Sequence, residues 1–138
     1  MNRKIKFRAW NEVSEKMLNW NDFLDTNMKN TFIAPESTGL ILMQYTGLHD
    51  ENGKEIYEND IVEFSYDIFT GNFDTKLGRG TIEFIDGAFY IKPFEIECKK
   101  IEDIDNGECF LLYTVNIDTL EIIGNIYDNP ELLGGEYD

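Results

Sequence analysis

The chain has 138 residues, enough for one domain that buries its own core without disulfides or a metal. Its 27 acidic and 12 basic residues give a net charge of −15, which disfavours direct binding to the phosphates of nucleic acids. Aromatic residues make up 14% of the chain and there are only 3 prolines, a composition that favours a β-rich fold.

The sequence carries no recognisable signal for export or membrane insertion. The charged start at residues 3–8 is not followed by the apolar run of a signal peptide. The longest apolar run, at residues 40–43, is far too short to span a bilayer. Cys98 and Cys109 are too far apart for a CxxC motif, and we expect both to be free thiols. These features predict a cytoplasmic protein without membrane contacts.

The first predicted strand covers residues 4–10, where apolar residues alternate with charged or aromatic ones. Ile5, Phe7 and Ala9 share the face that is expected to be buried. The opposite face carries Lys4, Lys6, Arg8 and Trp10. A basic strand of this kind in an acidic protein could meet an acidic surface on another copy of the chain.

A hairpin and a long connection are expected next. Residues 17–20 are predicted to return as the second strand of the hairpin, and residues 21–37 to form a connection that starts with a short helical turn. Residues 40–46 are predicted to form a buried strand. The Asn52-Gly53 dipeptide that follows supplies the positive φ angles that tight hairpin turns need.

The middle of the chain reads as strands and loops. Residues 60–69 are predicted to form a long strand, followed by a polar loop at 70–78. A clear hairpin has arms at 80–85 and 88–91, joined by an Asp-Gly turn. Residues 95–108 are dense in charge and are expected to form a loop.

The C-terminal part is predicted to contain two strands, at residues 109–115 and 120–127. Asn129 is a suitable N-cap and Pro130 a suitable first helical residue, so one short helical turn is expected after them. The last residues, 135–138, are expected to fray.

Three stretches resemble the YopX family of phage and prophage proteins of Gram-positive bacteria. They are FRAWNEVSEKM at residues 7–17, QYTGLHDENGKEIYENDIV at residues 44–62 and LEIIGNIYDNPELL at residues 120–133. Two positions depart from the family pattern: Asn59 stands where glycine is usual, and Asn11 where aspartate is usual. Asparagine is the non-glycine residue that best tolerates the left-handed conformation, so Asn59 is compatible with the same turn.

The resemblance implies a mainly β fold: a small SH3-like β-barrel with an N-terminal β-hairpin extension and a short C-terminal helical turn. It divides the chain into an N-terminal strand pair and connection (residues 1–37), a YopX-like SH3-type barrel (38–134) and a frayed tail (135–138). It implies no activity, because a fold of this type hosts many functions.

The stretch at residues 50–60 does not have the spacing of a calcium loop. Lys54 and Glu55 stand where an EF-hand has a ligand and its glycine. The acids of this stretch are instead expected to form a solvated rim: Asp50, Glu51, Glu55, Glu58 and Asp60. His49, the sole histidine, lacks the companions of a zinc site or a catalytic triad and is expected to be a turn residue. We expect no cofactor, no metal and no catalytic residue.

We therefore expect a non-enzymatic phage or prophage accessory protein that acts by protein binding, as a homo-oligomer or with a host or phage protein. The predicted contact residues are Arg8, Trp10, Trp20 and Tyr45, because exposed Trp, Tyr and Arg are enriched at interfaces. The same aromatic residues could instead form a small core at one end of the barrel. Turn geometry is assigned to Gly53, Asn59 and Asp60.

Two alternatives stay open. One is an acidic decoy that imitates DNA and occupies a host DNA-binding protein, which would require the carboxylates to form a continuous stripe. The other is a carboxylate-dependent hydrolase or nuclease, which would require two acids in one pocket and a raised pKa on one of them.

Overall fold

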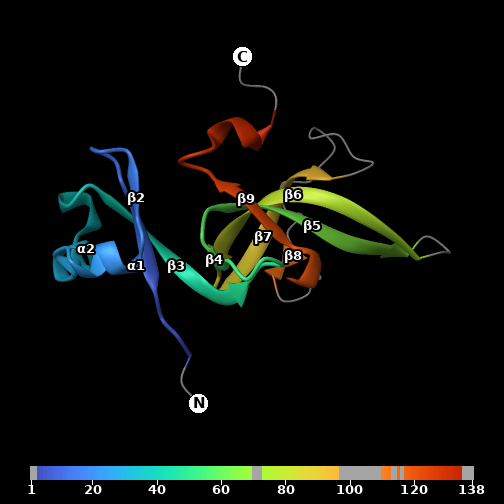
Figure 1. Ribbon diagram of the computed structural model, residues 1–138, viewed down its shortest axis with the longest axis horizontal. Coiled ribbons are helices and arrows are strands. Elements are labelled where there is room, and N and C mark those ends of the chain that lie inside the picture. Colours follow the sequence, from blue (N-terminus) through green and yellow to red (C-terminus); the bar gives the residue numbers. More distant parts are fainter. Residues whose placement is uncertain (1–2, 70–72, 97–109, 113–114, 116, 135–138) are drawn as a thin grey trace.

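The computed structural model describes residues 3–69, 73–96, 110–112, 115 and 117–134 (Figure 1). Within these residues a four-stranded antiparallel sheet has the order β2-β1-β3-β4, with β1 at Phe7–Asn11, β2 at Lys16–Leu18, β3 at Leu40–His49 and β4 at Glu55–Tyr57. A five-stranded antiparallel sheet has the order β8-β7-β6-β5-β9, with β8 at Phe110–Leu111, β7 at Ala88–Ile96, β6 at Phe73–Ile85, β5 at Asp60–Phe69 and β9 at Glu121–Asn125. The fold is mainly β, as predicted, and the second sheet curls into a half-barrel.

Two short helices pack beside the N-terminal strands, α1 at Trp20–Leu24 and α2 at Met28–Ile33. Each is capped by an asparagine: the Asn19 side chain accepts from the backbone N–H of Asp22, and the Asn27 side chain from that of Asn30. Phe23 of α1 is buried in a small core with Ala9 and Leu40. The predicted long connection at residues 21–37 is therefore mostly helical. It also contains a 3-10 turn at Pro35–Ser37. The prediction missed α2 because a six-residue helix is too short to show a helical period.

The N-terminal strand pair is a hairpin, as predicted, with Trp10 opposite Met17. β1 also pairs along its length with β3, so the hairpin is part of a sheet that β3 carries on toward the half-barrel (Figure 1). Lys6, the residue before β1, also lies beside β3, because the Tyr45 N–H donates to the Lys6 carbonyl at 2.9 Å. The alternation of residues 4–10 thus gives the strand two faces with different neighbours.

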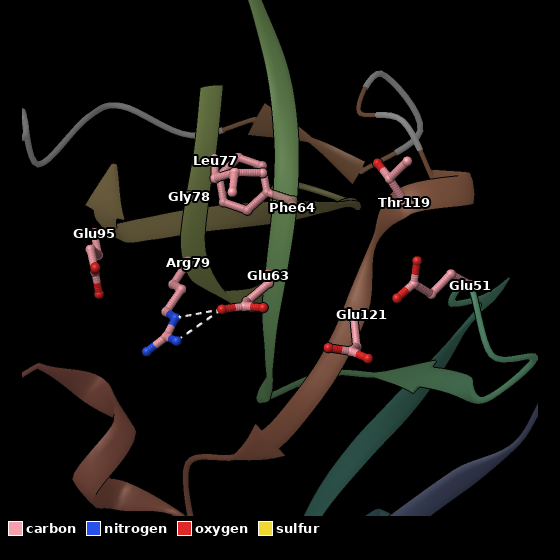
Figure 2. A pocket seen from close by; sticks show the side chains of 9 residues that line it. All are labelled: Glu51, Glu63, Phe64, Leu77, Gly78, Arg79, Glu95, Thr119 and Glu121. Atoms are coloured by element: carbon pink, nitrogen blue, oxygen red, sulfur yellow. Dashed lines mark hydrogen bonds and ion pairs between the residues drawn. The ribbon is translucent and has the colours of Figure 1, made fainter. Parts of the chain in front are cut away.

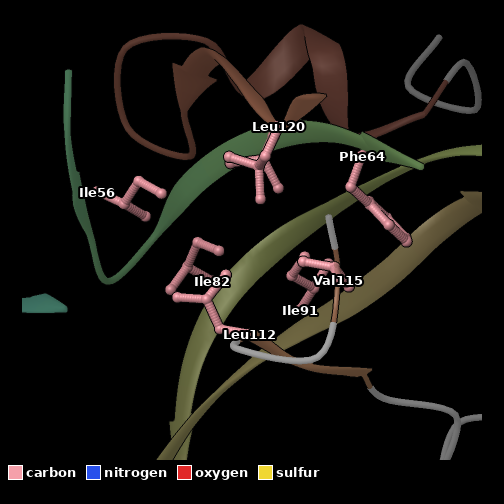
Figure 3. Close-up of a cluster of buried hydrophobic side chains, with 8 residues drawn as sticks. Ile56, Phe64, Ile82, Ile91, Leu112, Val115 and Leu120 are labelled. Carbon is pink, nitrogen blue, oxygen red and sulfur yellow. The ribbon is translucent and has the colours of Figure 1, made fainter. Parts of the chain in front are cut away.

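The main core lies inside the curled sheet (Figure 3). Its buried side chains come from β4 to β7 and from the segment before β9: Ile56, Val62, Phe64, Ile82, Ile91, Leu112, Val115 and Leu120. Gly80 lies at an irregularity in the pairing of β6 with β7. Glycine is required there, since a Cβ would lie 2.6 Å from the Lys92 carbonyl oxygen. The hairpin of β6 and β7 was predicted correctly, with its turn at Asp86-Gly87.

Several predicted boundaries differ from the structure. The strand predicted at residues 17–20 ends at Leu18, and Trp20 begins α1. The predicted loop at residues 70–78 is wrong from Phe73 onward, because β6 starts there and pairs with the far end of β5. The strand predicted at 109–115 is seen only as β8, and the loop predicted at 95–108 begins within β7; residues 97–109 lie outside the described part.

The C-terminal region agrees with its prediction. β9 lies inside the predicted strand at 120–127, and a 3-10 turn follows at Pro130–Leu133, where the short helical turn was expected. A second 3-10 turn, at Ile117–Thr119, precedes β9. The predicted frayed tail at 135–138 lies outside the described residues. None of the helices described here is long and apolar enough to cross a membrane.

Candidate functional site

Asp50 organises the turn that follows β3. Its Oδ1 accepts the backbone N–H groups of Asn52 and Lys54, both at 2.9 Å, and its Oδ2 accepts that of Ile122 in β9 at 3.0 Å. Desolvation works to raise the pKa of this carboxyl, but these donors and the Lys54 charge outweigh it, so the pKa of Asp50 lies below its ordinary value. The side chain is buried and ties the turn to a strand 72 residues away in sequence. It is not part of a solvated rim.

Gly53 and Asn59 both have positive φ, 79° and 68°. Asn59 lies between β4 and β5. Its N–H donates to the Ile82 carbonyl at 2.8 Å, and its carbonyl accepts from Ile126 at 3.1 Å. The left-handed conformation at this position therefore holds β6 and the end of β9 in place around the start of β5.

We expect Asn59→Ala to destabilise the fold by about 1 kcal/mol, because alanine lacks the tolerance of asparagine for positive φ. Asn59→Gly, the residue usual in the family, should leave stability unchanged or raise it slightly. Urea unfolding followed by tryptophan fluorescence measures both variants. Equal stability of the Asn and Ala proteins would mean that the backbone angle does not constrain this residue.

The basic and aromatic face of β1 and the residue before it contact β4, the start of β5 and the segment after β9, in a set of contacts that we call the junction. Lys6 Nζ lies 2.7 Å from Glu55 Oε2. Arg8 Nη2 lies 2.9 Å from Asp60 Oδ1 and also donates to the Glu58 carbonyl at 3.0 Å. The Trp10 ring stacks on Tyr127, with centroids 5.1 Å apart and planes 15° from parallel. Every second residue from 6 to 10 thus holds the N-terminal strand against the barrel.

Asp60 is the most enclosed charge of the junction, with 2% of its surface exposed. Its second oxygen accepts the Tyr57 N–H at 2.8 Å. Burial raises the pKa of Asp60, and the nearby Arg8 guanidinium opposes that rise. Burial, aided by the Glu55 charge, also raises the pKa of Tyr57 to about 12, and the Arg8 guanidinium lies 5.0 Å from the centre of its ring. Like Asp50, Asp60 corrects the expectation of a solvated rim.

The four predicted contact residues all have partners within the chain. Arg8 and Trp10 belong to the junction. Trp20 packs against the small core under α1. Tyr45 is 4% exposed and stacks obliquely on Tyr57, so it offers little surface to another molecule. The structure brings Arg8 and Tyr45 around Tyr57, and places Trp10 and Trp20 in separate packing contacts.

His49 was expected in a turn, but it is the last residue of β3 and pairs with Glu55 of β4. Its Nδ1 lies 3.5 Å from the Tyr45 hydroxyl, and the two rings meet edge to face. Among the described residues no group of three or more His, Cys, Asp or Glu side chains could hold a metal ion.

A cavity of about 350 Å³ opens on the half-barrel (Figure 2). We call it the acidic cavity, and it is lined by Glu51, Glu63, Phe64, Leu77, Gly78, Arg79, Glu95, Thr119 and Glu121. Arg79 pairs with Glu63 across β5 and β6 at 2.9 Å. A Cβ on Gly78 would lie 2.8 Å from the Phe64 ring, so glycine lets the ring lie against β6.

Sequence reasoning did not find the acidic cavity. Its acids come from a loop, from β5, from the end of β7 and from β9, and Leu77 with Gly78 had been assigned to a loop. The available signal was the excess of 27 acidic over 12 basic residues, which does not say where on the surface the acids lie.

The segment at residues 3–5, which we call the N-terminal arm, has the opposite charge. Arg3, Lys4 and Ile5 are all exposed, and Ile5 is exposed by 56%. Lys6, the next residue, already belongs to the junction. The arm thus presents two cations and an apolar side chain at the start of an otherwise acidic molecule.

These features define a small, mainly β protein whose basic N-terminal strand is held against a half-barrel with an acidic cavity. The family model for the YopX protein matches residues 6–134, and the chain therefore belongs to the YopX family. The resemblance noted in the sequence is confirmed.

Two solved structures are similar along nearly their whole length. Protein EF1440 from Enterococcus faecalis has 25% sequence identity and a TM-score of 0.56, with 96% of this chain and 100% of that chain covered. Protein yopX from Bacillus subtilis has 23% identity and a TM-score of 0.51, with 94% and 96% covered, and supports the fold. A search of curated proteins found no match.

Proposed function

We propose that the protein is a non-enzymatic phage or prophage accessory protein that acts by binding protein, and that it binds a second copy of itself through its N-terminal part. One observation carries this proposal. Of the seven large apolar side chains that are exposed among the described residues, five lie between residues 5 and 33: Ile5, Val13, Leu24, Phe32 and Ile33. Exposed apolar side chains that gather in one region are typical of protein contact sites.

Phe32 and Ile33, at the end of α2, lie beside the start of β1. The Phe7 and Phe32 rings meet edge to face at 5.2 Å, which places the end of α2 beside this strand. Ile33 follows Phe32 and is 72% exposed. Ile5 precedes Phe7 by two residues and continues the same face of the strand. We call Ile5, Phe32 and Ile33 the apolar patch.

The buried carboxylates support a binding role more than a catalytic one. A general acid needs a carboxyl that can exchange its proton with a substrate. Among the described residues, the two carboxyls whose pKa values are clearly shifted are Asp50 and Asp60, and both have their oxygens engaged by groups of the chain. Their shifts come from structural contacts with backbone N–H groups and with Arg8.

The test of self-association is Ile33→Asp. This change places a charge in the apolar patch, and we expect it to weaken association by about tenfold or more, because a buried interface would have to desolvate the carboxylate. Sedimentation velocity over a range of micromolar concentrations measures the change. Ile33 suits the test better than Trp10, whose loss would weaken the junction with Tyr127.

Val13→Asp is the matched control. Val13 is also exposed and apolar, but it lies in the turn after β1, at the opposite end of that strand from Ile5. It should leave association unchanged. A wild-type protein that stays monomeric throughout would contradict self-association, and an equal effect of both substitutions would contradict the choice of surface.

A further inference from the structure

The N-terminal arm and the acidic cavity are complementary in charge and in apolar character. We infer that the acidic cavity of one copy binds the N-terminal arm of a second copy, an inference that rests on the self-association proposed above. The arm contributes Arg3, Lys4 and Ile5, and the cavity contributes carboxylates and apolar side chains.

The cavity has more negative charge than it can balance. Arg79 pairs with Glu63, which leaves the carboxylates of Glu51, Glu95 and Glu121 without a balancing cation in the lining. Glu95 and Glu51 lie on opposite sides of the opening (Figure 2). The apolar part of the lining comes from Leu77, which is 63% exposed, and from the buried Phe64 beneath it. A segment with cations beside an apolar side chain matches both features.

The arm has that composition and is available for contact. In the part of the chain that the structure describes, neither Arg3 nor Lys4 forms an ion pair, whereas Lys6 is held by Glu55. The aliphatic stems of Arg and Lys can cover apolar surface while their charged ends meet carboxylates at the rim. Ile5 lies in the same short segment and can contact Leu77.

The arm and the cavity lie at different places on one molecule. Arg3, Lys4 and Ile5 line a separate hollow that includes Phe89 at the start of β7, whereas the cavity includes Glu95 at the end of β7. The contact therefore joins different surfaces of two copies. Such a heterologous contact generates a closed ring or an open chain, depending on the rotation between neighbours.

Two charge-reversed variants test the contact. The arm variant is Arg3→Glu with Lys4→Glu, and the cavity variant is Glu51→Lys with Glu95→Lys. All four side chains are exposed, and none takes part in an ion pair or side-chain hydrogen bond among the described residues, so folding should be unaffected. Each variant alone should associate at least about tenfold more weakly than the wild type, because like charges then face each other.

The equimolar mixture of the two variants is the decisive sample. One pair of compatible surfaces remains in it: the intact arm of the cavity variant and the intact cavity of the arm variant. The mixture should form heterodimers that do not grow further, seen by light scattering after size exclusion. Added salt should weaken both this heterodimer and the wild-type assembly, because it screens the charges.

Matched controls keep the same change in net charge. Lys16→Glu with Lys92→Glu controls for the arm, and Glu36→Lys with Glu131→Lys controls for the cavity; all four positions are exposed and none lines the cavity. These controls should associate like the wild type.

The outcomes separate this inference from the proposed function. A wild type that assembles while both variants assemble equally well would overturn the arm–cavity contact and leave self-association standing. Monomeric variants whose mixture stays monomeric would also overturn it. A wild type that is itself monomeric would overturn both proposals.

Discussion

Arg8→Ala is expected to destabilise the protein by about 3–5 kcal/mol, the usual cost of removing one partner from a buried ion pair. Arg8 Nη2 holds Asp60 at 2.9 Å and the Glu58 carbonyl at 3.0 Å. Without the guanidinium, the Asp60 carboxylate would be enclosed with the Tyr57 N–H as its one remaining hydrogen-bond donor. Urea unfolding at pH 7 measures the loss.

The pH dependence gives this prediction a second readout. Burial raises the pKa of Asp60 above its ordinary value of 3.8 and Arg8 opposes the rise, so Arg8→Ala should raise the pKa further. An acid with a raised pKa binds more protons in the folded state than in the unfolded state. Its stabilising effect is therefore complete below pH 3.8 and is lost as the pH rises through the folded pKa. The difference between wild type and Arg8→Ala should shrink on acidification from pH 7 toward pH 4.

A neutral pair is the control for this prediction. Arg8→Met with Asp60→Asn removes both charges and keeps an oxygen for the Tyr57 N–H, so it should cost clearly less than Arg8→Ala. Two results together would contradict the role of the enclosed charge: a double variant as unstable as Arg8→Ala, and a stability difference between wild type and Arg8→Ala that does not shrink at low pH. Packing of the Arg8 side chain would then be what stabilises the junction.

The two faces of the first strand could be predicted because burial imposes a period of two on a strand. Phe7 lies against Phe32 of α2, and Lys6 and Arg8 face the other way. The expected burial of Ile5 is wrong: it precedes β1 and is 56% exposed. What each face meets could not be predicted. The partners of Lys6 and Arg8 are about 50 residues away, and only the folded sheet brings them together.

In the turn after β3, the backbone angles could be predicted from the sequence but the burial of the acids could not. Its Asn-Gly dipeptide and the asparagine before Asp60 carry a local signal, and both have positive φ. The acids around them looked alike in sequence, although Asp50 and Asp60 are buried and Glu51 is exposed. Burial of a carboxylate depends on its donors, and the Ile122 N–H that reaches Asp50 belongs to the last strand. The acidic cavity was missed for a related reason, because four separate segments supply its acids.

Asp50→Ala is expected to destabilise the protein by about 2–4 kcal/mol, since hydrogen bonds to a charged acceptor contribute about 1.5–3 kcal/mol each and water can replace part of them. The change removes the acceptor of three backbone N–H groups, one of which belongs to β9, and leaves the hydrogen bond from the Glu51 N–H to the Leu120 carbonyl as a backbone link at the turn. Asp50→Asn keeps one of the two carboxylate oxygens and should cost less than alanine. Urea unfolding of the three proteins at pH 7 gives this order directly.

The sign of the pH dependence distinguishes Asp50 from Asp60. The pKa of Asp50 is lowered in the folded state, so its contribution is complete above pH 3.8 and is lost as the pH falls through the folded pKa. The stability of the wild type relative to Asp50→Asn should therefore rise with pH. Relative to Asp60→Asn it should fall with pH, because the pKa of Asp60 is raised. If the stability difference had the same pH slope for both asparagine variants, one of the two assignments would be contradicted. These are that backbone donors stabilise the Asp50 carboxylate, and that burial makes ionisation of Asp60 costly.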